Sequence, residues 1–307
     1  MKLGHVIESQ QFTVPMLAEL FRLSDEMERV VKRGGTRDYS NSIMASLFYA
    51  NSTRTRFSFE SAMYRLGGRV LSTEQAQKFS ADVEGESLED TVRVVSNYCD
   101  VIVLRPNEIG GAAKAAKVSR VPVINAGDGK GGQHPTQALL DLYTIYREIK
   151  TIDGAKVAMV GNLAEGRTVR SLAYLLGKFE RVKIFFVAPP EMQMRQDIID
   201  YLNHHNVWFA IESDLAKVLP QADVVYMTRV EPGVLGESPQ ENKGEGRYFI
   251  DEAMIWRLPQ SSIIMHPLPR SNEISPAVDS DPRSAYFRQT MNGIYVRMAL
   301  LVSVLDG

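Results

Sequence analysis

Short apolar runs alternate along the chain with longer amphipathic segments. The apolar runs predict strands at residues 43–49, 101–105, 121–126, 156–161, 182–187, 208–211, 224–228 and 263–266. The amphipathic segments predict helices at residues 54–66, 88–98, 135–149, 168–179, 192–202, 214–219, 249–257 and 282–305. Apolar strands that alternate with helices are typical of parallel sheets covered on both faces. The pattern therefore predicts an α/β fold.

The same pattern predicts two domains, each a mostly parallel sheet flanked by helices. A chain of 307 residues is long enough to build two separate cores. We place the first domain at residues 1–149 and the second at residues 150–281, with the break in residues 150–154. Residues 282–307 form a single apolar helix that needs a partner surface, and we expect it to pack back on the first domain.

Composition and charge argue against several classes of protein. The net charge is −2 and 44% of the residues are apolar, which argues against a nucleic-acid-binding surface and against a disordered chain. Cys99 is the one cysteine, so the chain has no disulfide framework and no thiolate metal cluster. No run approaches the ~18 apolar residues of a membrane span, and the N-terminus lacks a signal-peptide apolar region. We expect a cytoplasmic enzyme that contacts neither membrane nor nucleic acid.

The strongest chemical signal is a polar turn between the strand predicted at 43–49 and the helix predicted at 54–66. It reads Ser-Thr-Arg-Thr-Arg at residues 52–56. A helix N-terminus offers unpaired N–H groups and a partial positive charge, so it readily binds an anion. A capped helix with solvated arginines is the alternative, but two arginines and three hydroxyls exceed what capping requires. We interpret the turn as a phosphate-binding site.

Three further polar clusters follow strands or open helices. Arg105 closes the strand predicted at 101–105, and His-Pro-Thr-Gln at residues 134–137 opens a helix. His-Pro-Leu-Pro-Arg at residues 266–270 follows the last strand. Ligands of open α/β sheets bind at the carboxyl ends of the strands. A lone histidine at a helix start is more often a cap than a catalyst, but four such clusters together predict a site.

Residues 161–168 imitate a nucleotide-binding P-loop. They have its spacing after a strand, but Arg167 stands where that motif needs lysine. No acidic strand end supplies the magnesium ligand that an NTPase requires, so we do not favour that function. An arginine at a helix start suits a carboxylate better, because it pairs with both oxygens.

Taken in order, these motifs resemble those of the aspartate and ornithine carbamoyltransferases nearly from end to end. The resemblance rests on residues 48–60, 125–129, 133–137, 166–168, 226–229 and 266–270. The His-Pro-Leu-Pro-Arg form is similar to the aspartate branch, because ornithine enzymes typically carry a cysteine there. The resemblance implies a transferase that moves the carbamoyl group of carbamoyl phosphate to the amino group of an amino acid, giving a ureido product and phosphate. It implies no cofactor and no metal.

The resemblance also implies a role for each matching residue. Those that hold the phosphate would be Ser52, Thr53, Arg54 and Thr55, with Ser80 from the loop of a neighbouring subunit. The carbamoyl oxygen would be polarised by Thr55, Arg105 and His134. The carbamoyl NH₂ would donate hydrogen bonds to Gln137 and to the backbone carbonyls of Pro267 and Leu268. Fixed donors aimed at the oxyanion and the departing phosphate are what this reaction needs. The shared loop implies a homotrimer or a multiple of it; a regulatory subunit cannot be read from this chain.

The acceptor side departs from the aspartate branch. Arg167 and Arg229 remain to bind a carboxylate, but Glu84 stands where the family usually carries lysine and Glu231 where it carries glutamine. Ala50 replaces a common glutamate. The net change makes the site less positive, so we expect a less anionic acceptor, such as a short diamino acid. Two alternatives stay open. One is a genuine aspartate carbamoyltransferase that makes N-carbamoyl-L-aspartate in pyrimidine biosynthesis, and the other is a non-catalytic binding relative.

Overall fold

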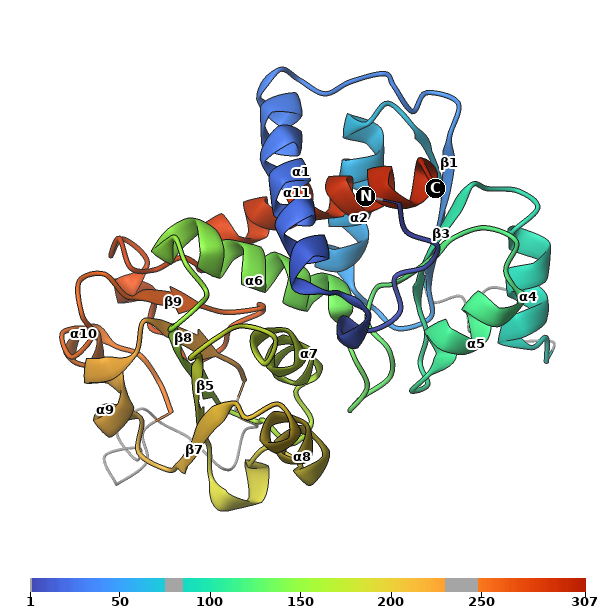
Figure 1. The fold of residues 1–307 in the computed structure, drawn as a ribbon. Helices are drawn as coiled ribbons and strands as arrows, with labels where there is room; N and C mark the ends of the chain where they lie inside the picture. Colours follow the sequence, from blue (N-terminus) through green and yellow to red (C-terminus); the bar gives the residue numbers. More distant parts are fainter. Residues whose placement is uncertain (1, 75–84, 230–247) are drawn as a thin grey trace. The chain divides into compact units, whose positions relative to one another are not determined.

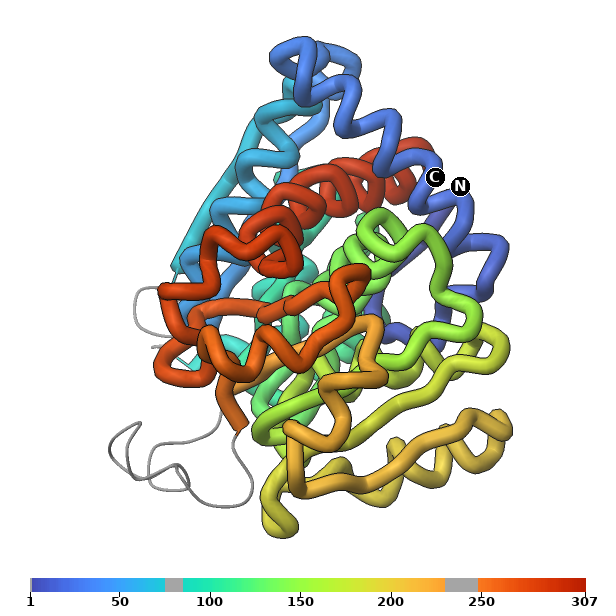
Figure 2. The backbone as a smooth tube through the Cα atoms, turned by 90° about the vertical axis from the view of Figure 1, so that its left-hand side faces the viewer, coloured from blue at the N-terminus to red at the C-terminus, as the bar shows by residue number. Residues whose placement is uncertain are grey.

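The computed structural model describes residues 2–74, 85–229 and 248–307, which form two compact units. Unit 1 comprises Met1–Tyr143 and Met291–Gly307, and unit 2 comprises Thr144–Thr290 (Figure 1). Both chain ends belong to unit 1 and lie side by side (Figure 2), where the Leu3 N–H donates to the Ser303 carbonyl at 2.9 Å. Unit 2 is therefore inserted into the sequence of unit 1.

Unit 1 is built on a four-stranded sheet in which every pair of neighbours is parallel. Its strands, in the spatial order β2-β1-β3-β4, are β2 (Arg69–Glu74), β1 (Ile43–Phe48), β3 (Val101–Arg105) and β4 (Val123–Asn125). Within the described residues, its complete helices are α1 (Val14–Lys32), α2 (Thr53–Arg65), α4 (Leu88–Val95) and α5 (Gly111–Val118). Helices α6 (Pro135–Ile149) and α11 (Tyr286–Leu305) begin in one unit and end in the other.

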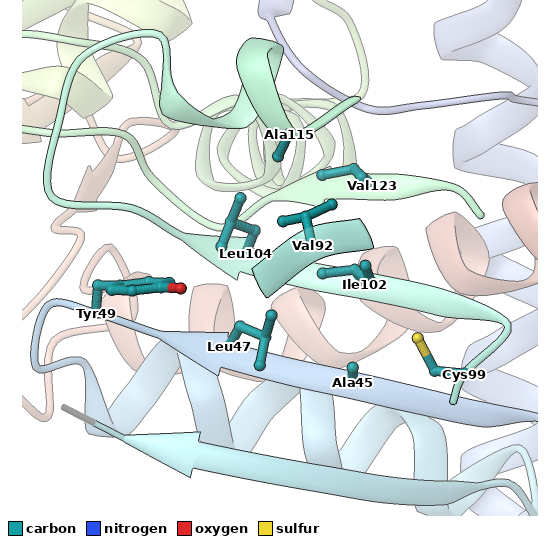
Figure 3. Packing of buried hydrophobic residues seen from close by; sticks show 9 residues of the cluster. All are labelled: Ala45, Leu47, Tyr49, Val92, Cys99, Ile102, Leu104, Ala115 and Val123. Carbon is teal, nitrogen blue, oxygen red and sulfur yellow. The ribbon is translucent and has the colours of Figure 1, made fainter. Parts of the chain in front are cut away.

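Helices cover both faces of this sheet. Successive side chains of β1 point to opposite faces, so they contact helices on both sides. Ala45 and Leu47 pack on one face with Val92 of α4 and Ala115 of α5 (Figure 3). On the other face the Ser46 hydroxyl donates to Glu60 of α2 at 3.0 Å. The carboxyl ends of β1 and β3 thus meet helix starts at one edge of the sheet, as ligand binding in this fold class requires.

Unit 2 holds a five-stranded sheet, again with every neighbouring pair parallel. In the spatial order β7-β6-β5-β8-β9 its strands are Trp208–Glu212, Lys183–Val187, Lys156–Val160, Val224–Met227 and Ile263–Met265. Figure 1 shows α7 (Arg167–Leu176) and α8 (Gln196–His204) on one side of this sheet, and α9 (Leu215–Val218) and α10 (Glu252–Ile255) on the other. The predicted α/β fold with two parallel sheets is confirmed.

The structure adds elements that the hydrophobic pattern did not predict, namely α1, β2 and α5. Helix α1 is fixed at its start by Thr13, whose hydroxyl accepts from the Met16 N–H at 3.4 Å. The units divide within α6, between Tyr143 and Thr144, which is earlier in the chain than residues 150–154, where the sequence analysis places the break. Among the described residues, no helix combines the length and apolar character needed to cross a membrane.

Candidate functional site

The polar turn at residues 52–56 lies where β1 passes into α2. Ser52 is the N-cap residue, and within the described chain its hydroxyl makes no capping bond to the helix. Thr53 and Arg54 are exposed, whereas Thr55 is buried. The N–H groups of the first helical turn lack intrahelical partners, so they and the polar side chains around them form the start of an anion site.

The second arginine of this turn has another role. Arg56 pairs with Glu74 at 3.0 Å and donates to the Ser72 hydroxyl at 3.2 Å, both on β2. Its guanidinium also lies over the Phe57 ring, 5.2 Å from the centroid. Arg56 therefore ties α2 to the edge strand, whereas Arg54 of the same turn is exposed.

Arg105 stands next to the same turn because β1 and β3 are paired. Phe48 lies opposite Arg105 in the sheet, and the Tyr49 N–H donates to the Arg105 carbonyl at 3.0 Å. The guanidinium is almost buried, with 9% of the residue exposed, and its Nη1 donates to the Ala126 carbonyl at 3.0 Å. A cation held this way at a strand end keeps a fixed position for a ligand.

Gly127 brings Arg105 and His134 together. Its φ of +112° belongs to a turn that Asn125 shapes, because the Asn125 Oδ1 accepts from the Gly127 N–H at 2.8 Å. A Cβ on Gly127 would lie 3.0 Å from Arg105 Nη1 and 3.0 Å from His134 Cδ2. Both side chains therefore press against the space that this glycine leaves empty.

Two site residues lie at the start of helix α6. His134 immediately precedes the helix and is buried, with 5% exposed; its Nδ1 lies 3.4 Å from the Thr136 hydroxyl. Gln137 lies one turn further on, where its Nε2 donates to the Asp141 Oδ1 at 2.9 Å. That bond leaves the Gln137 Oε1 as the acceptor end of the amide. Unit 1 thus gathers Thr55, Arg105, His134 and Gln137 at adjoining strand ends and helix starts.

In unit 2, the two arginines expected to bind a carboxylate follow neighbouring strands. Arg167 begins α7 after the β5 turn, and Arg229 lies two residues beyond β8. The Asn162 N–H donates to the Arg229 carbonyl at 3.1 Å, which joins the two loops. Gly161 allows this approach, because a Cβ there would lie 2.5 Å from the Thr228 carbonyl oxygen.

His266 holds the turn that contains Pro267 and Leu268. Its Nδ1 accepts from the Leu268 N–H at 2.8 Å, so the ring proton is on Nε2, which donates to Glu273 at 2.8 Å. Burial raises the pKa of Glu273, but hydrogen bonds from His266 and from the Ser271 N–H outweigh it, and the pKa is below its ordinary value. His266 is therefore a structural residue. Arg270 of the same motif pairs with Asp279 at 2.6 Å and is structural as well.

Three residues of the predicted site lie outside the described residues: Ser80, Glu84 and Glu231. The supporting residues Gly127, Asp141 and Glu273 were not predicted. Asp141 could have been found, since it lies one helical turn after Gln137 and this spacing brings side chains together. Gly127 lies in the Asn-Ala-Gly-Asp-Gly motif, whose glycines mark a tight backbone.

Comparisons with known proteins agree with this arrangement. Residues 4–147 match the family model "Aspartate/ornithine carbamoyltransferase, carbamoyl-P binding domain", and residues 153–304 match "Aspartate/ornithine carbamoyltransferase, Asp/Orn binding domain". The chain belongs to the aspartate/ornithine carbamoyltransferase family and is a carbamoyltransferase enzyme.

Individual relatives extend over nearly the whole chain. The chloroplastic aspartate carbamoyltransferase of Oryza sativa subsp. japonica is 51% identical over 100% of this chain and 86% of its own length. The catalytic subunit of aspartate carbamoyltransferase from Methanopyrus kandleri is 45% identical over 98% of this chain and 97% of its own. The structure of Trypanosoma cruzi aspartate transcarbamoylase with carbamoyl aspartate and phosphate matches with a TM-score of 0.90 and 37% identity, covering 99% and 96% of the two chains.

Proposed function

We propose that this enzyme transfers the carbamoyl group of carbamoyl phosphate to the amino group of aspartate, giving N-carbamoyl-aspartate and phosphate, a step of pyrimidine biosynthesis. The observation that carries the proposal is the 51% identity to an aspartate carbamoyltransferase across the full chain. The Trypanosoma cruzi relative, solved with carbamoyl aspartate and phosphate, supports it.

Unit 1 has the groups that such a reaction needs for its donor. We assign the phosphate to the turn after β1, where it would be bound by Ser52, Thr53, Arg54 and Thr55. We assign the carbamoyl oxygen to three hydrogen-bond donors of unit 1, namely Thr55, Arg105 and His134. The acceptor nitrogen attacks the carbonyl carbon, the C–O bond to phosphate breaks, and the phosphate leaves with the electron pair. The amine proton goes to the departing phosphate. Preformed donors stabilise charge that develops in the transition state, so they lower the barrier.

The remaining groups orient the substrates. The Gln137 Oε1 points away from Asp141 and is an acceptor for the carbamoyl NH₂, as are the carbonyls of Pro267 and Leu268. Arg167 and Arg229 bind the acceptor's carboxylates, because a guanidinium pairs with both carboxylate oxygens. We also propose a homotrimer in which Ser80 reaches the donor site of a neighbouring subunit. Light scattering would test this, and a fully active monomer would exclude shared sites.

Two substitutions test the donor site. Arg54→Ala should weaken carbamoyl phosphate binding, because each charge-assisted hydrogen bond contributes ~1.5–3 kcal/mol. His134→Ala should lower kcat more than it raises the donor dissociation constant, because its contact strengthens as the oxyanion forms. Unchanged binding in Arg54→Ala would rule out the 52–56 turn as the phosphate site. Arg56→Ala is the matched control, since Arg56 pairs with β2 and should leave donor binding largely intact.

A second acceptor class remains a candidate because of Glu84 and Glu231. Two acidic residues in place of a lysine and a glutamine favour an acceptor with one carboxylate, although the relatives' identity supports aspartate better. Labelled carbamoyl phosphate should be incubated with aspartate, ornithine and shorter diamino acids, and the ureido product identified. We expect aspartate turnover at an ordinary enzymatic rate of ~1–10³ s⁻¹.

The double reversal Glu84→Lys with Glu231→Gln separates the two candidates. With aspartate as the natural acceptor, we expect it to change kcat/KM for aspartate by less than about tenfold, because the native site already accommodates both carboxylates. With a less anionic acceptor, it should raise kcat/KM for aspartate by orders of magnitude and weaken the native substrate, since specificity is a difference of affinities.

A further inference from the structure

A buried arginine lies behind the donor residues of unit 1. Arg297 of α11 is 4% exposed, and its Nη1 donates to the Ser58 hydroxyl of α2 at 2.9 Å. Its guanidinium lies over the Phe59 ring, 5.2 Å from the centroid. The side chain crosses Gly293, where a Cβ would lie 2.6 Å from Nη1 and 3.2 Å from Leu140 of α6. Arg297 therefore lies where α11 meets both α2 and α6.

The anion that acts on this arginine is Asp141 of α6. Asp141 is fully buried, and its charge favours the protonated guanidinium. Burial nevertheless lowers the pKa of Arg297 to about 10, so the group is destabilised but still charged at neutral pH. Burying two charges is costly, and well-packed apolar side chains often serve stability as well or better. The pair therefore calls for a reason other than stability.

That reason is the amide of Gln137. The Asp141 carboxylate can only accept hydrogen bonds, and it accepts one from the Gln137 Nε2 at 2.9 Å. The reversed amide would place its oxygen against the carboxylate, which repels it. A neutral residue at position 141 would lack this preference, because a hydroxyl or amide can accept or donate. The negative charge thus selects one orientation of the amide.

We propose that the buried carboxylate of Asp141 is a positioning residue that fixes the Gln137 amide with its Oε1 presented to the carbamoyl NH₂ of the donor. The inference rests on the donor site of the proposed function. Arg297 also holds Ser58, six residues after the N-cap of α2, so one buried cation braces both helices whose first turns carry the donor site.

A double-mutant cycle between Gln137 and position 141 tests the proposal. Position 141 is changed in two ways. The first variant, Asp141→Leu combined with Arg297→Met, removes both charges and keeps an apolar interior. We expect kcat/KM for carbamoyl phosphate to fall about tenfold or more, the loss expected from one hydrogen bond to a charged group. Asp141→Asn, nearly the same shape, should cost about two- to fivefold, because its amide holds either orientation of Gln137. In a Gln137→Ala background, both changes should alter kcat/KM by less than twofold.

The matched control is Tyr143→Phe. Tyr143 also lies on α6 and donates to Asp25 at 2.6 Å, so its loss removes a bond of the same helix without touching Gln137. It should lower the melting temperature and leave kcat/KM unchanged. Losses from Asp141→Asn that persist at full size in the Gln137→Ala background would overturn the positioning role, even if the apolar pair failed to fold. A Gln137→Ala variant with parental activity would overturn the donor-site assignment itself.

Discussion

Gly127→Ala is expected to impair catalysis by separating Arg105 from His134. The added Cβ would lie 3.0 Å from atoms of both side chains and 3.3 Å from His134 Cγ. Optimal contacts between heavy atoms are about 3.5–4.0 Å, so the two groups must move apart by several tenths of an ångström. Both are proposed to donate to the same carbamoyl oxygen, and Arg105 is also held by its hydrogen bond to the Ala126 carbonyl.

The size of the effect follows from this geometry. A misplacement of about 1 Å costs roughly 10²-fold in rate, so we expect kcat to fall about 10–100-fold. The backbone contributes separately, because a non-glycine residue at a φ of +112° is strained. That strain costs about 1–3 kcal/mol. The melting temperature falls by about 2–4 °C for each kcal/mol in a domain of this size.

Gly154→Ala is the control that isolates the backbone cost. Gly154 has a φ of +78°, and a Cβ added to it would meet no heavy atom of the described chain within 4 Å. It should lower the melting temperature and leave kcat unchanged. The assay is steady-state phosphate release with varied carbamoyl phosphate, alongside thermal unfolding. If Gly127→Ala kept kcat within twofold of Gly154→Ala, the placement of Arg105 and His134 around one oxygen would be wrong.

Two further predictions concern thiol reactivity and the pH dependence of stability. Burial raises the pKa of the Cys99 thiol to about 11, so the native protein should resist iodoacetamide at pH 8 while the unfolded protein reacts; rapid alkylation of the native protein would contradict this. The fold lowers the pKa of Glu273, so its ionised form stabilises the protein at neutral pH and this contribution is lost as the pH falls below the unfolded value of about 4.3. Glu273→Gln should therefore melt lower than the parent at pH 7. The difference in melting temperature should begin to shrink only below about pH 4.3 and should close as the pH falls through the lowered pKa of the folded state; a constant difference would assign the stability to packing alone.

The sequence predicted the parallel strands well, because buried strands are continuous apolar runs. The prediction for β3 matches the structure at both ends, and α6 was also predicted with its observed bounds. Strand β2 was missed for a physical reason. It is an edge strand whose residues are exposed or half-buried, so it carries no apolar run to recognise.

Helix α1 carried signals that periodicity alone did not register. Thr13 is a good N-cap residue, and Pro15 in the first turn is pre-organised for a helix. Helix α5 is harder to predict from the sequence, because the residue that caps its start lies far away in the chain. Asp128 accepts hydrogen bonds from the N–H groups of Gly110 at 3.2 Å and Ala112 at 3.3 Å. A cap that comes from sixteen or more residues away cannot be read from local sequence.

The candidate site was also predicted in part: the motif residues were identified, but the residues that hold them in place were not. Motifs located Arg105, His134 and Gln137, because their residue types and positions at element ends are local properties. The residues that hold them are distant in sequence, and Arg297 reaches α2 from 239 positions away. The acceptor was the least predictable feature. The charges of Glu84 and Glu231 predict a less anionic acceptor, whereas the relatives favour aspartate.

The insertion of unit 2 into unit 1 has a consequence for biosynthesis. A ribosome releases residues 144–290 before residues 291–307, so unit 2 has its whole sequence while unit 1 still lacks its last helical turns. Domains usually fold as units in the order of synthesis, but here the unit that starts first finishes last. Arg297 belongs to the segment that follows unit 2, so a nascent chain would gain the Arg297 contact behind its donor residues only after unit 2 has been synthesised.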